Sequence, residues 1–287
     1  MTPRIRGNDY TSLNPPRIGA WTPTMRVSIV IPAYNNQDKL DLTLAGLATQ
    51  TYPAELMEVI VVDNASSDGT SAYLEDFARR HPDVRVVLNR ENLGFAAGNN
   101  VGLSIATGDY LVVLNNDTVV TQGWVMTLLR HFQNDPSLGI VGPVTNNIGN
   151  EARIETRYQS IAEMPGEALR YTLANMGKTY PMRTVAFFCV MFPRSVYELC
   201  GPICEDYSLG FFEDDDYCRR VESIGKRVVC AEDVFIHHHL SASFNKLKDS
   251  ERQELFRQNK EVYEKKWGAW VPHTYRSAGP RAIRGNG

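Results

Sequence analysis

The sequence has no hydrophobic run long enough to cross a membrane. Its longest apolar stretch, Val185–Phe192, has eight residues, whereas a membrane-spanning helix needs roughly 20. The N-terminal residues 1–21 are polar, contain three arginines and lack the apolar core of a secretory signal. We therefore expect a soluble protein located in the cytoplasm.

Cysteine is scarce, and neither sign of charge dominates. The five cysteines form an odd set without zinc-ribbon spacing, which predicts buried or free thiols in a reducing compartment. The formal net charge is -3 and the pI is about 6.1, so the chain has no basic field typical of a nucleic-acid-binding protein. A bound phosphate would instead be held locally, by a metal ion or by backbone amides.

Common catalytic signatures are also missing. The segment Asn92–Asn100 does not contain G-x-G-x-x-G, and the chain has no Walker P-loop. It has no G-x-S-x-G turn that would indicate a hydrolase. Asn92–Asn100 instead combines small residues and amides just before an expected helix, which lets backbone and amide groups approach a ligand closely.

Hydrophobic strand patterns alternate with helical ones, which predicts βαβ units and an α/β fold with a mainly parallel sheet flanked by helices. Strands are expected at 27–31, 59–62, 84–88, 110–114, 183–192 and 234–236. Helices are expected at 40–47, 74–78, 96–106, 124–132, 163–176, 194–200, 215–224 and 249–266. Candidate N-caps for the second helix are Ser66, Ser67 and Asp68, and the thin apolar stripe of the last is Leu255 and Val262.

Polar segments follow three of these strands. In parallel sheets ligands bind beyond the carboxyl ends of the strands, so these positions are candidates for a binding site. Turns and helix caps are the alternative for any single segment, and three at one sheet edge favour a site. The segments are Pro32-Ala33-Tyr34-Asn35, Asp63-Asn64-Ala65-Ser66-Ser67-Asp68 and Asn115-Asn116-Asp117.

Two groups of acids are suited to catalysis. Asp117 closes a hydrophobic strand, and a divalent cation that bridges two phosphates needs only one or two protein carboxylates; an Asn-Asn-Asp turn is the alternative. Residues 213–216 are four consecutive acids, and their repulsion raises the pKa of at least one carboxyl, which suits a general base. The alternative is that these acids are stabilised at the start of a helix by its dipole. Both can hold at once, with Asp215 and Asp216 at the helix start and Asp214 as the general base.

Three consecutive histidines, His237-His238-His239, follow the last expected strand. An imidazole beside a phosphate-bound metal is a natural additional ligand. Surface or half-buried positions are the alternative.

Together these segments resemble family 2 of the inverting glycosyltransferases, which have the GT-A fold, and in particular its rhamnosyltransferase-like members. Residues 27–35 and 61–70 are similar to the family's first two nucleotide-binding segments, and 92–100 to its N-x-G-F-x-x-x-x-N element. Asn115-Asn116-Asp117 stands where the family has D-x-D, and residues 212–216 resemble its E-D-x-D motif. The resemblance covers roughly 27–244, and its five motifs occur in the family's order.

The resemblance implies a role for each matching residue. Asp63 would recognise the nucleobase, Asp117 would hold Mn²⁺ or Mg²⁺ on the donor diphosphate, and Asp214 would be the catalytic base. His238 fits the family's metal-ligand spacing best, and His237 is its competitor. Because Asn115 replaces an acid, a lower metal affinity is expected. The remaining donor-side residues would be Pro32, Ala33, Tyr34, Asn35, Asn64, Asp68, Asn92, Gly94, Phe95, Asn99, Asn115 and Asn116, and the acceptor side would include Glu213 and Asp216.

The resemblance also implies the substrates and the organisation of the chain. The donor would be a UDP- or dTDP-sugar, with rhamnose as one candidate, and the acceptor a glycan, lipid-linked glycan or protein of the cell surface. An extended tail (1–25) would precede the GT-A domain (26–245), divided into a nucleotide-sugar-binding half (26–145) and an acceptor and base half (146–245), with a C-terminal helix and basic tail at 246–287.

Two other functions and one membrane contact remain open at this point. An inactive sugar-nucleotide-binding module has no use for a base such as Asp214, and a nucleotidyltransferase would carry a glycine-rich basic loop in place of Ala33-Tyr34-Asn35-Asn36. The C-terminus could contact the inner face of an anionic membrane peripherally, or its tryptophans could pack on the protein. Its lysines, arginines and tryptophans are Lys265, Lys266, Trp267, Trp270, Arg276, Arg281 and Arg284.

Overall fold

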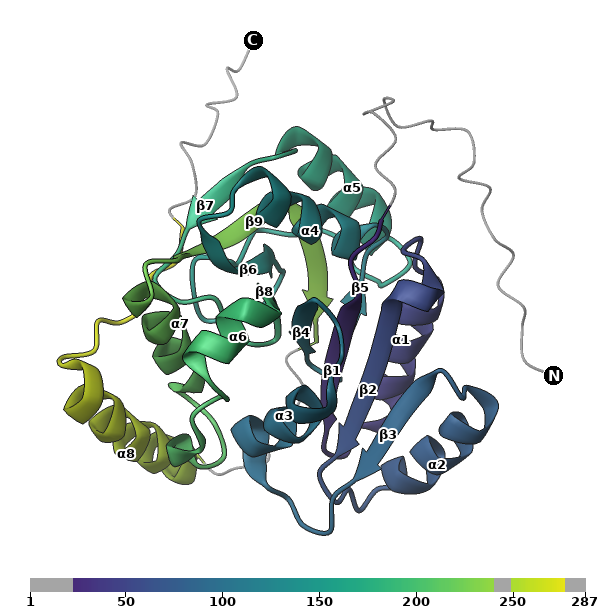
Figure 1. Cartoon of the computed structure of the whole chain (residues 1–287), viewed down its shortest axis with the longest axis horizontal. Coiled ribbons are helices and arrows are strands. Elements are labelled where there is room, and N and C mark those ends of the chain that lie inside the picture. Colours follow the sequence, from purple (N-terminus) through teal and green to yellow (C-terminus); the bar gives the residue numbers. More distant parts are fainter. Residues whose placement is uncertain (1–22, 240–248, 277–287) are drawn as a thin grey trace.

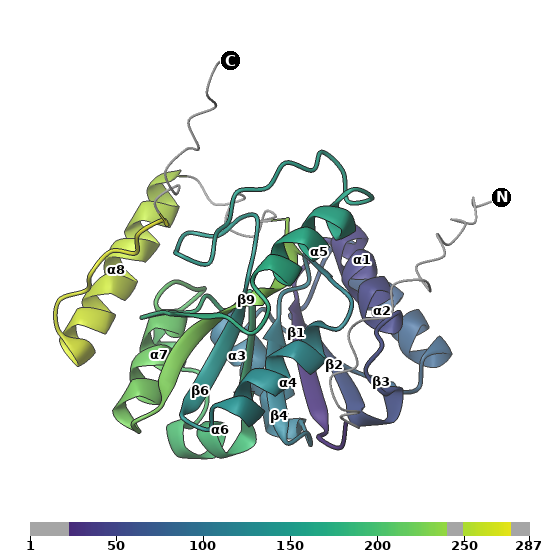
Figure 2. The same cartoon turned by 90° about the horizontal axis from the view of Figure 1, so that it is seen from above.

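The computed structural model describes residues 23–239 and 249–276. Figures 1 and 2 show a central sheet with helices on both faces, so the α/β fold class is confirmed. Within these residues the strand order is β3-β2-β1-β4-β8-β6-β9-β5, and β7 pairs with β9. The strands are β1 (Val27–Ala33), β2 (Met57–Asp63), β3 (Val84–Leu88), β4 (Tyr110–Leu114), β5 (Thr118–Val120), β6 (Leu138–Val144), β7 (Thr179–Pro181), β8 (Cys189–Pro193) and β9 (Arg227–His238).

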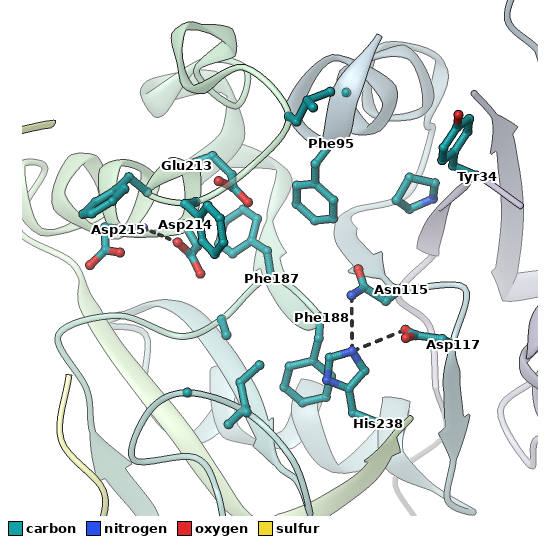
Figure 3. A pocket seen from close by; sticks show the side chains of 18 of the residues that line it. Tyr34, Phe95, Asn115, Asp117, Phe187, Phe188, Glu213, Asp214, Asp215 and His238 are labelled. Atoms are coloured by element: carbon teal, nitrogen blue, oxygen red, sulfur yellow. Dashed lines mark hydrogen bonds and ion pairs between the residues drawn. The ribbon is translucent and has the colours of Figure 1, made fainter. Parts of the chain in front are cut away.

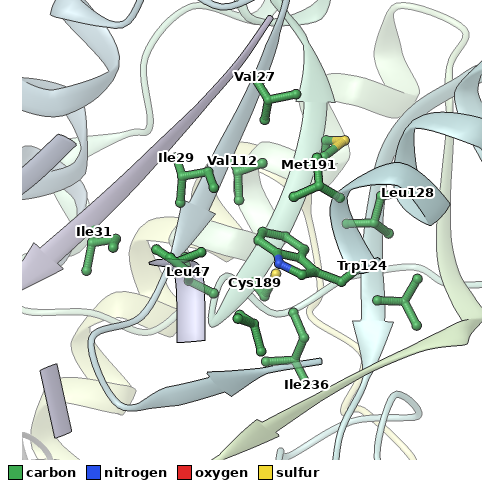
Figure 4. Packing of buried hydrophobic residues seen from close by; sticks show 14 of the residues in the cluster. Val27, Ile29, Ile31, Leu47, Val112, Trp124, Leu128, Cys189, Met191 and Ile236 are labelled. Carbon is green, nitrogen blue, oxygen red and sulfur yellow. The ribbon is translucent and has the colours of Figure 1, made fainter. Parts of the chain in front are cut away.

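The helices form two layers because side chains alternate along the buried strands. Ile29 and Ile31 of β1 face one cluster with α1 and α4, while Val30 faces the other with α3 and α7. Figure 4 shows the first cluster, in which Trp124 packs beside Met191 and Leu128. The helices are α1 (Gln37–Ala48), α2 (Thr70–Arg80), α3 (Gly94–Ile105), α4 (Trp124–Asn134), α5 (Met164–Ala174), α6 (Arg194–Cys200), α7 (Glu213–Ser223) and α8 (Asp249–Trp267), with short 3₁₀ turns at Ala54–Leu56 and Glu205–Tyr207.

The sheet is parallel in its first half and mixed in its second. Strands β1, β2, β3 and β4 pair in parallel, as expected. Strand β8 then runs antiparallel to β4 and β6, and β5 runs antiparallel to β9. The β5–β9 pairing places Thr118 opposite His238, so the segment that ends at Asp117 lies beside the histidines.

The expected strand at 183–192 is too long. Strand β8 begins only at Cys189, which pairs with Leu114 at the end of β4. Residues 183–188 have no strand opposite them and form a loop, in which Phe187 and Phe188 line a cavity. Strands β5, β6 and β7 were not expected. In β6, Gly139, Gly142 and Pro143 interrupt the strand pattern. Strand β9 is longer than the expected 234–236 because the buried Glu232 and Asp233 continue it.

One local prediction is wrong, and a second is confirmed only in part. The N-cap of α2 is Gly69, at φ 94°, in place of Ser66, Ser67 or Asp68, although the Asp68 carboxylate accepts hydrogen bonds from the Thr70 amide and hydroxyl (3.2 and 2.6 Å). In α8 the buried residues are Asn259 and Tyr263, and Phe256 and Val262 are partly buried against the same cluster, so Val262 of the expected stripe is confirmed and Leu255 is not. The reason is that α8 packs on the turn before α7, which selects its inward face.

Free cysteines and packed tryptophans are both confirmed. All five cysteines are unpaired, and Cys189, Cys218 and Cys230 are buried. The indole of Trp267 donates a hydrogen bond to Asp216 (2.7 Å). The predicted membrane contact is not tested by these observations, and Arg281 and Arg284 lie outside the described residues. None of the helices in residues 23–239 and 249–276 has the length and apolarity of a membrane span.

Candidate active site

A cavity of about 720 Å³ opens beyond the carboxyl ends of β1, β2 and β4. It gathers most of the residues that the sequence singled out, from segments far apart along the chain. Figure 3 shows the Asp117–His238 pair on one side of this cavity and the acids of α7 on the other, with Phe95 and Phe187 between them. The predicted residues that line it are Pro32, Ala33, Tyr34, Asn35, Asn64, Asn92, Gly94, Phe95, Asn115, Asn116, Asp117, Glu213, Asp214 and His238.

Asp117 and His238 form the first reactive group. His238 Nε2 lies 3.3 Å from Asp117 Oδ1, and both side chains are buried. The other ring nitrogen, Nδ1, is 3.1 Å from the carbonyl oxygen of Asn147. A carbonyl can only accept, so in the neutral imidazole Nδ1 carries the proton and Nε2 presents its lone pair toward Asp117. The ring is also held by stacking on Phe188, with 4.9 Å between centroids.

His237 and His239 belong to a different environment. Successive side chains of a strand point to opposite faces, and His237 accordingly contacts the Tyr158 hydroxyl through Nδ1 (2.6 Å). Burial and the neighbouring His239 and His238 lower the pKa of His237 to about 4. His237 does not line the cavity. Of the two histidines predicted as ligands, the geometry favours His238.

These residues fit a divalent cation that is shared with a diphosphate. In the described part of the chain no three His, Cys, Asp or Glu side chains converge as a complete metal site. One carboxylate and one imidazole nitrogen are available at Asp117 and His238, and Mn²⁺ accepts both kinds of ligand. A cation of the Mg²⁺ type keeps most of its positions for phosphate oxygens and waters, so this donor set is sufficient.

The acids at the start of α7 form the second reactive group. Burial, together with the charge of Asp215, raises the pKa of Asp214 to about 7. Burial and the charges of Asp214 and Asp215 raise the pKa of Glu213 well above its ordinary value. A carboxyl with a pKa near neutrality is suited to removing a proton from a hydroxyl, because it is partly ionised and still basic.

The other two acids are held by structural contacts. Asp215 accepts a hydrogen bond from Thr184 (2.9 Å) and lies 3.4 Å from His273 Nε2. Asp216 is fully buried and pairs with Arg220 (2.9 Å) and Lys266 (2.6 Å). Asp216 is not among the residues that line the cavity, and its predicted place on the acceptor side remains a prediction.

Several predicted donor-side residues support the cavity wall without lining it. The Asp63 carboxylate accepts hydrogen bonds from the hydroxyls of Ser66 and Ser71, both at 2.5 Å, and Asp63 is not among the lining residues. Its predicted contact with the nucleobase remains a prediction. Asp68 holds the first turn of α2, and Asn99 is buried within α3 with its amide donating to the Phe95 carbonyl (2.9 Å).

Comparison with known proteins assigns this site to a family. Residues 28–200 match the sequence pattern of the family described as Glycosyl transferase family 2. The chain belongs to this family. It is 28% identical over 213 residues to the glycosyltransferase AglE of Haloferax volcanii, covering 74% of this chain and 66% of that protein. It is 33% identical over 146 residues to the uncharacterized glycosyltransferase YfnE of Bacillus subtilis, covering 50% and 37%. The matches therefore span less than two thirds of the length of these relatives.

The fold of this family 2 chain is confirmed as GT-A by solved structures. The mannosyltransferase PcManGT of Pyrobaculum calidifontis, in complex with GDP-Man and Mn²⁺, aligns with a TM-score of 0.63 and 21% identity over 87% of this chain and 67% of its own. S. aureus TarS in complex with UDP-GlcNAc aligns with a TM-score of 0.58 and 16% identity over 84% and 67%. At these identities the likeness concerns the fold alone.

Four residues that line the cavity of this glycosyltransferase-family chain were not predicted individually from its sequence. The C-terminal segment contributes Arg252, Phe256, Trp270 and His273. Burial alone would lower the pKa of His273, but its hydrogen bond with Asp215 and the charges of Asp215 and Asp214 raise it. The available signal was the cluster of aromatic residues after the charged helix. Nothing in its local pattern indicates that it folds back onto α7.

Gly94 of the family-like N-x-G-F element connects the donor side to the acids. It has φ +82°, and an added Cβ would lie 2.9 Å from the carbonyl oxygen of Ser208. Ser208 belongs to the turn that precedes α7. A residue with a side chain is therefore excluded here by both backbone conformation and space.

Replacing Gly94 with alanine is expected to displace this turn and lower turnover. The strained backbone should also cost about 1–3 kcal/mol in the free energy of unfolding. Gly123→Ala is the matched control, because Gly123 has φ +75° with nothing within 4 Å of an added Cβ. Turnover and thermal unfolding of both variants would be measured. Equal turnover in the two variants would contradict the proposed contact.

Proposed function

We propose that this chain is an inverting, metal-dependent glycosyltransferase that moves a sugar from a nucleoside diphosphate donor to an acceptor hydroxyl. The observation that carries the proposal is a single cavity with a carboxylate–imidazole pair on one side and a carboxyl of pKa about 7 on the other. Family membership supports it. So does the likeness of fold to proteins solved with GDP-Man and Mn²⁺ or with UDP-GlcNAc.

Each side of the cavity would have its own task. Asp117 and His238 would hold the cation, which neutralises charge on the leaving diphosphate when bound. Asp214 would accept the proton of the acceptor hydroxyl as that oxygen attacks the anomeric carbon. Asp214 and the Asp117–His238 pair lie on opposite sides of the cavity (Figure 3). Attack from the face opposite the leaving group would then invert the anomeric centre.

The pH dependence of the reaction follows from the raised pKa of Asp214. Only the ionised carboxylate can accept a proton, so kcat/KM is expected to rise with pH and level off above about 7. Below that value it should fall about ten-fold per pH unit. The measurement is kcat/KM against pH at saturating metal, and the same profile for Asp214→Asn is the control. A wild-type profile without this acid limb would contradict the assignment.

The donor and acceptor are less defined than the reaction. We propose UDP- or dTDP-sugars, including rhamnose donors, because a carboxylate such as Asp63 matches the imide N–H of uracil or thymine. The Asp63 carboxylate already accepts hydrogen bonds from two serines. If these bonds keep it from the base, other groups must recognise the nucleobase, and a guanine nucleotide is then the specific alternative. For the acceptor we propose a glycan or lipid-linked glycan.

The experiment that tests this function measures the release of free nucleoside diphosphate. A panel of UDP-, dTDP- and GDP-sugars would be incubated with the full chain, with Mn²⁺ and separately with EDTA. Metal-dependent turnover of one donor is the expected result and identifies the nucleotide and sugar together. Donor-induced thermal stabilisation without turnover would favour an inactive binding module, whereas absence of both turnover and stabilisation would contradict the proposed function. Pyrophosphate release from a nucleoside triphosphate and a sugar phosphate would favour a nucleotidyltransferase.

A further inference from the structure

The turn that leads into the acids of α7 has an unfavourable backbone. Ser208, Phe211 and Phe212 have φ of 49°, 73° and 75°, a region that residues with side chains rarely adopt. Phe212 is the N-cap of α7, and its carbonyl accepts a hydrogen bond from the Asp216 amide (2.9 Å). The turn therefore sets where α7 begins, and with it the place of Asp214. Backbone strain of this kind persists only when surrounding structure holds it.

One buried side chain from a helix distant in sequence donates hydrogen bonds to backbone carbonyl groups of this turn. Asn259 of α8 is 3% exposed. Its Nδ2 lies 2.6 Å from the carbonyl oxygens of both Tyr207 and Gly210, and 3.4 Å from that of Phe211. An amide nitrogen has two hydrogens, which the two short bonds use. Asn259 thus bonds the strained turn at two points, Tyr207 and Gly210.

Aromatic packing fixes the amide in place. Phe256 and Tyr263, one turn to either side of Asn259 on α8, contact the ring of Phe212 with centroid distances of 5.0 and 5.6 Å. Residues at this spacing share one helix face, so α8 presents the amide between two rings. Figure 1 shows α8 beside α7 at the edge of the molecule.

The opposite side of the turn touches the donor half. The Ser208 carbonyl lies against Gly94, whose position leaves no room for a Cβ. Leu209, Phe211 and Phe212 also line the cavity. The turn is therefore held between the donor-side segment and α8, and its position is set by both.

We propose that Asn259 is a positioning residue that holds the turn 207–212, so that Asp214 faces the acceptor hydroxyl. The proposal rests on the proposed function only where it predicts that loss of Asn259 lowers the turnover of sugar transfer. It extends the catalytic unit to α8, which lies beyond the family match at 28–200. Asn259 itself does not line the cavity and acts through the turn.

The test compares Asn259→Ala and the milder Asn259→Ser with wild type, all as the full chain. The control is Gln258→Ala, which removes an exposed neighbouring amide that hydrogen-bonds Glu254 on the same helix. In Asn259→Ala, turnover should fall on the order of 10–10²-fold, the loss expected for a small misplacement of a catalytic group. Donor affinity in the presence of Mn²⁺ should stay unchanged. The acid limb of the pH profile should move to lower pH, because a displaced Asp214 is better hydrated. Asn259→Ser should show the same changes to a smaller degree.

Hydrogen exchange separates this proposal from the proposed function. Backbone amides of 208–212 should exchange faster in both Asn259 variants, while amides of β1 and β4 stay protected. This readout does not require turnover, so it decides the anchoring even if the wild type releases no nucleoside diphosphate. Unchanged exchange in the turn would overturn the proposal. A second outcome would also overturn the proposal. If Asn259→Ser shows faster exchange or a lower Tm but keeps the turnover and pH profile of the wild type, Asn259 serves stability alone.

Discussion

Replacing Asp214 with asparagine is expected to lower the rate of sugar transfer by about 10²–10⁴-fold, the contribution of a general base. Donor affinity should be unchanged, because the Asp117–His238 pair lies on the other side of the cavity (Figure 3). Asparagine has nearly the same shape, and its carbonyl oxygen can keep the hydrogen bond from the Asp215 amide (2.9 Å). Turnover and calorimetric donor binding would be measured on the same preparation.

Protein stability provides an internal control for this variant. The pKa of Asp214 is raised in the folded chain, mainly by burial, so its ionisation opposes folding above its unfolded pKa. At a pH above about 7, Asp214→Asn should therefore have a Tm equal to or higher than the wild type. Glu213→Gln is the matched comparison, because Glu213 also lines the cavity. Loss of transfer only in Glu213→Gln would reassign the base, and collapse of donor affinity in Asp214→Asn would make Asp214 a binding residue.

Replacing Asp117 with alanine is expected to abolish the gain in donor affinity that Mn²⁺ provides. Asp117 supplies the carboxylate beside His238 Nε2, and His238 alone is a weak site for a hard cation. Loss of even an outer-shell partner typically costs about 10–100-fold in metal affinity, and loss of a ligand should cost at least as much. Donor titrations by calorimetry, with Mn²⁺ and with EDTA, provide the measurement.

Asp76→Ala is the control for this experiment. Asp76 is a carboxylate on α2 that pairs with Arg79 and Arg80 at the surface, so its loss should leave the metal effect intact. Donor affinity that responds to Mn²⁺ equally in wild type and Asp117→Ala would rule out the metal role. A metal effect that survives in Asp117→Ala but disappears in His238→Ala would place the cation on the histidine alone.

Local pattern was sufficient for the first half of the fold. Strands β1 to β4 and their helices were expected from periodicity, because each element buries one face within a short window of sequence. The polar residues after these strands were expected at one sheet edge for the same reason, and Asn35, Asn64 and Asp117 do line one cavity. Strand β6, with two glycines and a proline, carries no comparable signal; its burial between β8 and β9 overrides its propensity.

The sequence by itself determined the α/β class, the family, and many of the residues that meet in the cavity, because these follow from periodicity and from motifs read in order. The tertiary structure alone decided which residues work together. Pairing of β5 with β9 turns His238 toward Asp117 and His237 away, a consequence of strand register that no single segment contains. Docking of α8 brings Asn259 to the turn before Asp214. Contacts of this kind depend on which faces the whole chain buries together, and a local window of sequence does not record that.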